Sequence, residues 1–207
     1  MSRPFHKTYS PATEDLDAIV NDGTGATLTL LVSSAGDGLA HQIAIASGAN
    51  ISTLVFTITG TDADGVAQTD TITGISNSTV ESTKYFLTWS SITISATLGA
   101  NTVDIGWVDE FVTPTIPLNR RANNGAAFEV VVTGTIDYDV QQTLSDLGSP
   151  PPWNWTDIPA ELVDAVDLIA VTASEQFRMS PLPSGIRLAA NSYSAAAKLD
   201  LYIVHSS

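Results

Sequence analysis

The sequence predicts an all-β protein with two β-sandwich or jelly-roll-like domains and one short helix near residues 159–170. Three observations support this fold class. Apolar residues recur at every second position, clusters of Gly, Asn and Asp separate the recurring runs, and only 14% of the residues are charged. Successive side chains of a strand point to opposite faces, so a period of two indicates strands with one buried face. A typical domain has about 25% charged residues, and here Thr, Ser, Ala and Gly take their place.

The first half of the chain contains several short alternating runs. They cover residues 54–59, 66–73, 92–96 and 103–107. The sequence Asp62-Ala63-Asp64-Gly65 separates the first two runs, and a turn at 99–101 separates the last two. Many short strands with turn residues between them are typical of a sandwich or a small barrel.

The clearest strand of the second half spans residues 128–141. The apolar residues that share one parity are Phe128, Val130, Val132, Ile136, Tyr138 and Val140. Polar residues fill most of the other parity, so one face of this strand is expected to be buried and the other exposed to water. Gly134 lies in the middle of the run and predicts a bulge or a bend. A last strand is expected at 198–203.

One segment of the second half has helical spacing instead. Its apolar residues are Leu162, Val163, Val166, Ile169 and Ala170. Asp157 precedes Pro159 as a capping residue precedes a proline in the first turn of a helix. This pattern predicts a short helix over 159–170.

The domain boundary is expected where Pro114 and Pro117 bracket an extended connector. We therefore expect an N-terminal arm at 1–11, a first β-sandwich domain at 12–113, a connector at 114–117, and a second β-sandwich domain at 118–207. The arm carries Arg3, His6 and Lys7, and the expectation is that it orders only against a neighbouring acidic subunit.

Charge and composition exclude several classes of partner. The net charge is −14, so the surface repels phosphate backbones and anionic lipid, and neither nucleic acid nor membrane is expected as a partner. The chain has no cysteine, which excludes disulfides and thiolate metal sites. No apolar run reaches the roughly 18–20 residues of a transmembrane helix, and the N-terminus does not resemble a signal peptide, so folding in the cytoplasm is expected.

The sequence contains a weak candidate for a calcium site at Asp62 and Asp64. Asp-x-Asp-Gly offers oxygen ligands of the kind that Ca²⁺ prefers, but a glutamate at the twelfth position is missing, where Thr73 stands. The alternative is a hairpin turn in which Gly65 supplies a positive φ angle, and the flanking strand patterns favour this alternative.

No catalytic constellation stands out elsewhere in the sequence. His6, His41 and His205 lack the spacing of a zinc motif. Asp137 and Asp139 would lie about 7 Å apart on the wet face of a strand, without the burial that raises the pKa of a catalytic acid. We therefore expect no catalytic residue, no metal and no cofactor, and a protein that is not an enzyme.

Trp153 and Trp155 follow Pro150-Pro151-Pro152 and alternate on a stiff loop. Two exposed indoles could stack against a sugar ring. Packing against the domain itself or against a neighbouring subunit is the favoured interpretation, because both cores and interfaces recruit Trp.

Several segments resemble virion structural proteins of tailed bacteriophages. In the first half these are 37–43 (DGLAHQI), 56–65 (FTITGTDADG), 68–74 (QTDTITG), 83–86 (TKYF) and 104–107 (DIGW). In the second half they are 132–141 (VTGTIDYDVQ), 186–188 (IRL) and 191–193 (NSY). The resembling segments are strands and turns, and the resemblance carries over no catalytic residue.

The resemblance implies a non-enzymatic structural protein of the virion, assembled in the cytoplasm of a bacterial host. The expected role is a capsid decoration or cement protein that stabilises the head. It would contact the major capsid protein and copies of itself, with a homotrimer as the expected form of such an ornament. Two alternatives stay open: a structural protein of the portal or tail, and a module that binds host glycans through Trp153 and Trp155.

Overall fold

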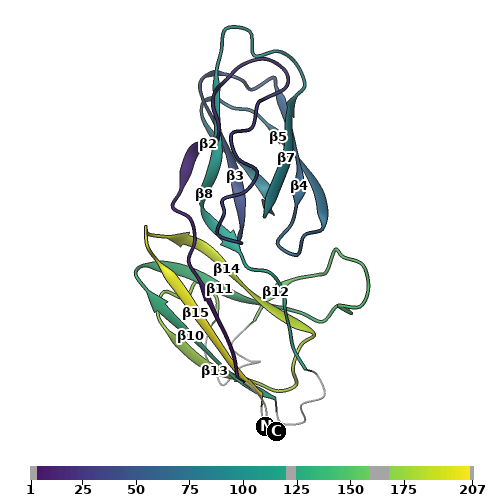
Figure 1. Cartoon of the computed structure of the whole chain (residues 1–207), viewed down its shortest axis with the longest axis vertical. Coiled ribbons are helices and arrows are strands. Elements are labelled where there is room, and N and C mark those ends of the chain that lie inside the picture. The colour runs from purple at the N-terminus through teal and green to yellow at the C-terminus, as the bar shows by residue number, and fades with distance from the viewer. Residues whose placement is uncertain (1–3, 120–124, 159–167, 206–207) are drawn as a thin grey trace. The chain divides into compact units, whose positions relative to one another are not determined.

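The computed structural model describes residues 4–119, 125–158 and 168–205, and over these residues the chain is all-β without a helix (Figure 1). The predicted fold class is therefore confirmed. The chain divides into two compact units. We call residues 12–111 the inserted unit, and residues 1–11 together with 112–207 the terminal unit. In the described part of the chain, no helix is long and apolar enough to span a membrane.

The inserted unit is a sandwich of two antiparallel sheets. One sheet contains β2 (Asp15–Gly23), β8 (Val103–Val112), β3 (Ala40–Asn50) and β6 (Ser76–Phe86), in that order. The other has β4 (Val55–Thr61) between β5 (Ala67–Thr73) and β7 (Thr88–Ile94). Side chains from both sheets form one core, with Ile43, Ile45 and Ile105 from the first and Phe56, Ile58 and Ile92 from the second. All six are fully buried.

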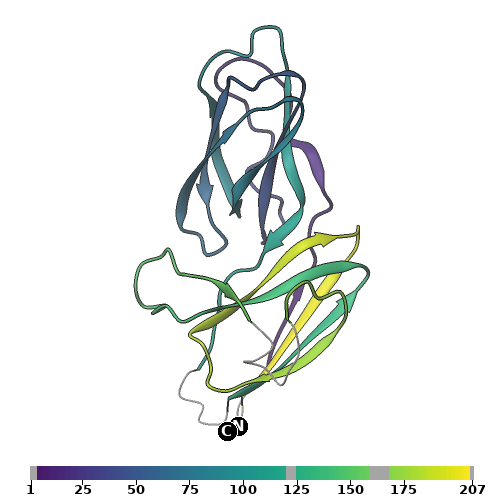
Figure 2. The ribbon, with the colours of Figure 1, turned by 180° about the vertical axis from the view of Figure 1, so that it is seen from behind.

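The terminal unit brings the two ends of the chain into one sheet. Its four strands lie in the order β1 (Phe5–Tyr9), β15 (Lys198–His205), β10 (Ala126–Thr133) and β13 (Glu175–Met179), as Figure 2 shows from behind. A second group contains β12 (Thr156–Asp157), β11 (Ile136–Thr143), β14 (Gly185–Tyr193) and the short β9 (Ile116–Pro117). In β15 and β10, the buried side chains are apolar and lie on one face. The side chains of the other face are exposed or half-buried.

The N-terminal segment is a strand of this unit. Residues 5–9 pair with β15 from Phe5 opposite Ile203 to Tyr9 opposite Leu199, and Tyr9 is buried. The prediction that the arm orders only against a neighbouring subunit is therefore wrong for His6 and Lys7, because β15 of the same chain satisfies the backbone of β1. Arg3 lies outside the described residues. A segment of five mostly polar residues is too short for its periodicity to reveal a strand.

The long strand predicted at 128–141 is two strands in different sheets. Gly134 has a φ of +79° and, with Thr135, turns the chain between β10 and β11. The bend predicted at Gly134 is confirmed, and the single strand is wrong. Phe128 and Tyr138 are both buried, because a two-residue bend leaves the alternation in step on either side. Periodicity alone therefore could not separate one strand from two.

The structure also sharpens the expected domain limits. The units divide between Phe111 and Val112, close to the predicted limit at 113. The predicted connector 114–117 includes β9, where Ile116 is buried and pairs with Ile186 of the terminal unit. The predicted helix at 159–170 falls largely on 159–167, which lie outside the described residues. Residues 168–170 are not helical, and Ala170 has a φ of +54°.

Candidate functional site

Asp37 and His41 form a buried ion pair in the inserted unit. His41 lies in β3 and Asp37 in the loop before it, and their side chains are 0% and 7% exposed. The Nε2 atom of His41 is 2.8 Å from Oδ2 of Asp37. The other ring nitrogen, Nδ1, is 3.1 Å from the carbonyl oxygen of Glu110 in β8.

Both ring nitrogens of His41 face hydrogen-bond acceptors. A carbonyl oxygen only accepts hydrogen bonds, so Nδ1 of His41 carries a proton. The carboxylate of Asp37 accepts the backbone N–H of Ala12 at 2.7 Å and that of Leu39 at 3.0 Å, as an ionised group does. Nε2 of His41 faces this carboxylate, so both ring nitrogens lie against acceptors. Burial alone raises the pKa of Asp37, but the hydrogen bond and the charge of His41, with the two backbone donors, outweigh burial and lower it.

This pair is architectural. In a catalytic triad one ring nitrogen of the histidine faces a carboxylate and the other faces a nucleophile. Here the second nitrogen is bound to the carbonyl oxygen of Glu110, so it has no capacity to activate a hydroxyl. The rings of Trp107 and Phe111 border the imidazole, with centroids 6.3 and 6.2 Å away. The pair fastens the loop before β3 and the chain at Ala12 to the first sheet.

A hollow on the outer face of the four-stranded sheet is the best candidate for a binding site. Its volume is about 390 Å³, within the range of about 300–1,000 Å³ that is usual for small-molecule sites. The residues that line it come from β10, β13 and β15, and they are Ala127, Phe128, Glu129, Gln176, Phe177, Arg178, Tyr202 and Val204. Phe128 and Phe177 point to the buried face of the sheet, where they stack on each other with centroids 4.9 Å apart and support the strands behind the hollow.

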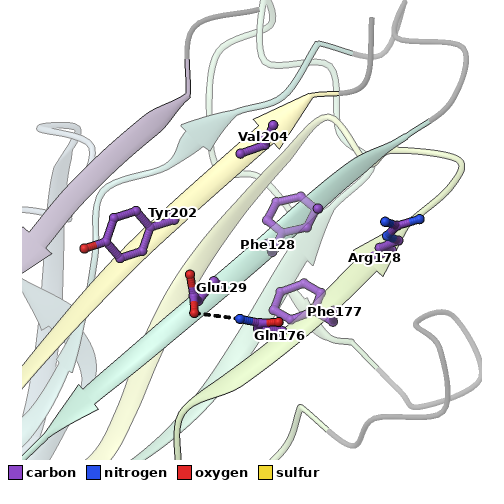
Figure 3. Close-up of a pocket in the computed structure, with 8 residues that line it drawn as sticks. Phe128, Glu129, Gln176, Phe177, Arg178, Tyr202 and Val204 are labelled. Atoms are coloured by element: carbon purple, nitrogen blue, oxygen red, sulfur yellow. Dashed lines mark hydrogen bonds between the residues drawn. The ribbon is translucent and has the colours of Figure 1, made fainter.

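Strand register places the other lining residues in two rows across the sheet. Glu129 is opposite both Tyr202 and Gln176, and Ala127 is opposite both Val204 and Arg178. The small side chain of Ala127 leaves space between its larger neighbours. Figure 3 shows Tyr202 on one side of the group and Arg178 on the other, with Glu129 and Gln176 between them.

Two contacts fix side chains of the hollow in advance. The Nε2 amide of Gln176 donates to Oε1 of Glu129 at 2.7 Å, drawn as the dashed line in Figure 3. The ring of His6, from β1, stacks on Tyr202 with centroids 4.2 Å apart and an interplanar angle of 3°. His6 is itself 3.2 Å from Asp200, whose pKa is lowered first by the hydroxyl of Thr8 and then by His6. The aromatic wall is therefore oriented before any ligand arrives.

The residues of the calcium candidate form a hairpin turn between β4 and β5. Oδ1 of Asp62 accepts the backbone N–H groups of Asp64 and Val66, both at 2.9 Å, and Gly65 has a φ of +78°. The hairpin interpretation is thus the one that the structure shows. In the described part of the chain, no group of three or more His, Cys, Asp or Glu side chains is placed to hold a metal.

Trp153 and Trp155 make contacts within the terminal unit. The guanidinium carbon of Arg187 lies 4.5 Å from the ring centroid of Trp155, and Arg187 also donates to Gln141 at 2.7 Å. The indole N–H of Trp153 donates to the carbonyl oxygen of Ser149 at 3.1 Å. Both indoles are half-buried. The contact of Trp155 with Arg187 favours packing of this loop over sugar stacking there.

The carboxylates on the wet face of β11 are joined by an amide. Nδ2 of Asn191 donates to Asp137 at 3.1 Å and to Asp139 at 3.2 Å. Asp139 also accepts the backbone N–H of Ala170 at 2.6 Å. These contacts hold β11, β14 and the segment at Ala170 together, which is a structural use of both carboxylates.

Sequence reasoning did not find the hollow. Glu129 and Tyr202 occupy the polar parity of strands that were predicted, so their exposure could be foreseen. Gln176 and Arg178 belong to β13, which was not predicted because five residues with two apolar members give little periodicity. These residues lie side by side because of the pairing register between β10, β13 and β15, and no local sequence pattern encodes that register.

No protein-family model matches this chain, and no curated protein matches it either. The resemblance of its segments to phage virion proteins therefore stays a prediction from the sequence. The fold does not identify the function, because β-sandwiches occur in proteins with many unrelated roles.

Proposed function

We propose that this chain is a non-enzymatic structural protein of a bacteriophage particle that decorates the capsid and stabilises the head. The observation that carries the proposal is that the segments resembling virion proteins are used for architecture. The segment 37–43 contributes the buried Asp37–His41 pair, and 56–65 forms β4 and the hairpin turn. The polar side chains of these segments make contacts that stabilise the fold.

Asp70 supports the same interpretation, because it joins two more of these segments. Its side chain in β5 is 9% exposed, and Oδ2 accepts the backbone N–H groups of Thr83 at 2.7 Å and Lys84 at 3.2 Å, as well as the hydroxyl of Thr83. The segments 68–74 and 83–86 are thereby fastened to each other across the two sheets of the inserted unit. A carboxylate with four donors is fully occupied and leaves no capacity for catalysis.

Two exposed leucines and a strand rich in Ser and Thr are the candidate contacts to other subunits. Leu31 is 62% exposed in the inserted unit and Leu144 is 70% exposed in the terminal unit, each in a loop. Single exposed apolar side chains are common on monomeric proteins, so each of these is a position at which contact with another subunit is to be tested. In β6, exposed Ser and Thr side chains add hydrogen-bonding groups without net charge. The expected partners are the major capsid protein and copies of this chain.

Quantitative mass spectrometry of the purified particle, from a host that carries this gene, tests the proposal. Hundreds of copies per particle are expected for a decoration protein, whereas about ten copies would indicate a ring at the portal or tail. Absence of the chain from the purified particle would overturn the structural role. Leu144→Ser provides a matched variant: it should fold normally and reduce the copy number if this loop contacts the shell.

A further inference from the structure

We propose that the hollow on the outer face of β10, β13 and β15 binds a neutral saccharide unit. The site is separate from the loop of Trp153 and Trp155, and the proposal does not depend on the virion role. Its evidence is a space of about 390 Å³, an aromatic wall fixed in advance, and a balanced set of hydrogen-bonding groups.

The charge of the lining selects a neutral ligand. Glu129 and Arg178 are the ionised residues that line the hollow, and their charges cancel. An anionic ligand would meet Glu129 inside the hollow and a net charge of −14 on the whole chain. A cationic ligand would meet Arg178. A neutral ligand avoids both penalties.

The hydrogen-bonding groups suit neighbouring hydroxyls. Glu129 accepts through its carboxylate, Arg178 offers up to five donors, and Gln176 can do both. Among the described residues, Arg178 has no hydrogen bond or ion pair, so its guanidinium is available to a ligand. A hydroxyl donates and accepts at once, so adjacent hydroxyls can bind Glu129 and Gln176, which lie within hydrogen-bonding distance of each other.

The remaining lining is apolar and fits the C–H face of a sugar ring. Tyr202, Val204 and Ala127 supply this surface, and Val204 is 49% exposed. The stacking of His6 holds the ring of Tyr202, so little side-chain entropy is lost when a ligand packs against it. A saccharide is the common ligand class that combines a neutral charge, adjacent hydroxyls and an apolar face.

The test begins with the full chain on an array of neutral and carboxylated oligosaccharides. Titration calorimetry then measures Kd for the neutral oligosaccharide with the strongest signal. Arg178→Ala and Glu129→Ala should each raise Kd about tenfold, because each removes a charge-assisted hydrogen bond. Tyr202→Ala should raise it as well, through loss of the apolar wall.

Lys198→Ala is the matched control. Lys198 is an exposed cation on the same face of β15, four residues or about 13 Å from Tyr202, and its replacement should leave Kd unchanged. The side chains of Arg178 and Lys198 are both exposed on the outer face. Arg178→Ala and Lys198→Ala are therefore both expected to unfold at the wild-type temperature. Absence of binding to any neutral oligosaccharide would overturn the proposal. So would binding of carboxylated oligosaccharides alone, or equal affinity of Arg178→Ala and the wild type.

Discussion

Replacing His41 by Ala removes the imidazole of the buried pair and leaves the carboxylate of Asp37 without its main partner. The side chains are 0% and 7% exposed, so bulk water does not reach this pair in the folded wild type. The backbone N–H groups of Ala12 and Leu39 still bind Asp37, which limits the loss. The carbonyl oxygen of Glu110 also loses its donor.

The expected cost follows from these contacts. Removing one partner of a buried ion pair typically destabilises a protein by about 3–5 kcal/mol, and the two remaining donors place this case near the lower value of about 3 kcal/mol. For a unit of about 100 residues, 1 kcal/mol corresponds to roughly 4–8 °C, so the unfolding temperature of the inserted unit should fall by about 12 °C or more.

Native-state hydrogen exchange, read on peptides of β3 and β8, measures the free energy of unfolding of the inserted unit by itself. The exposed pair of His6 and Asp200 is the matched control, since it has the same residue types at 3.2 Å with side chains 48% and 25% exposed. His6→Ala, read on peptides of β10 and β15 in the terminal unit, should cost at most about 1 kcal/mol. A cost below about 1 kcal/mol for His41→Ala would refute the argument that the buried pair is ionic.

The same pair gives a pH dependence with a definite sign. The folded-state pKa of Asp37 is lowered, so the unfolded chain binds a proton first as the pH falls. The stabilisation from this carboxylate is therefore complete above the unfolded pKa of about 3.9 and is lost as the pH falls through the lowered folded pKa. Asp37→Asn lacks this group, so the stability advantage of the wild type over the variant should shrink as the pH falls below about 5. If the stability advantage of the wild type grew as the pH fell, the predicted direction of the pH dependence would be wrong.

Three further predictions concern the inserted unit. Gly60→Ala should destabilise it by roughly 1–3 kcal/mol or more in urea unfolding, because the new Cβ would lie 1.9 Å from the carbonyl oxygen of Thr88. Trp89→Ala should cost about 3–5 kcal/mol by the same assay, since the side chain is 1% exposed and its indole donates to Val32 at 2.6 Å; a cost under 1 kcal/mol would contradict its place in the core. Asp62→Ala should cost about 1–3 kcal/mol through two lost hydrogen bonds, and millimolar Ca²⁺ should not change the unfolding temperature of the wild type. A rise with Ca²⁺ would restore the metal interpretation.

The sequence predicted the strands that have one buried face and a clear period of two. The runs at 54–59, 92–96 and 198–203 lie within or overlap β4, β7 and β15. The buried apolar residues of these runs are Leu54, Phe56, Ile58, Ile92, Ile94, Leu199, Leu201 and Ile203, whereas Val55 and Ala96 are exposed. Short strands escaped detection, because β1 and β13 have five residues each and few apolar side chains. Such strands form because a neighbouring strand completes their backbone hydrogen bonds, which is a tertiary effect.

The candidate site was harder to foresee than the fold. Its residues come from 127–129, 176–178 and 202–204, which meet only through the order β15-β10-β13. His41 is a related case: its spacing suggested an ordinary histidine, and its structural role depends on two acceptors, one of which is the backbone of Glu110, 69 residues away.

The sequence by itself determined the all-β class, the acidic surface, the turn at Asp62–Gly65 and the bend at Gly134, because each depends on local preference or on composition. Tertiary structure alone decided that β1 joins β15, that β10 and β11 belong to different sheets, and that Glu129, Arg178 and Tyr202 surround one hollow. The physical reason is that strand pairing is made between segments far apart in the chain. Alternation specifies which face of a strand is buried, but it carries no information about which strand lies beside it.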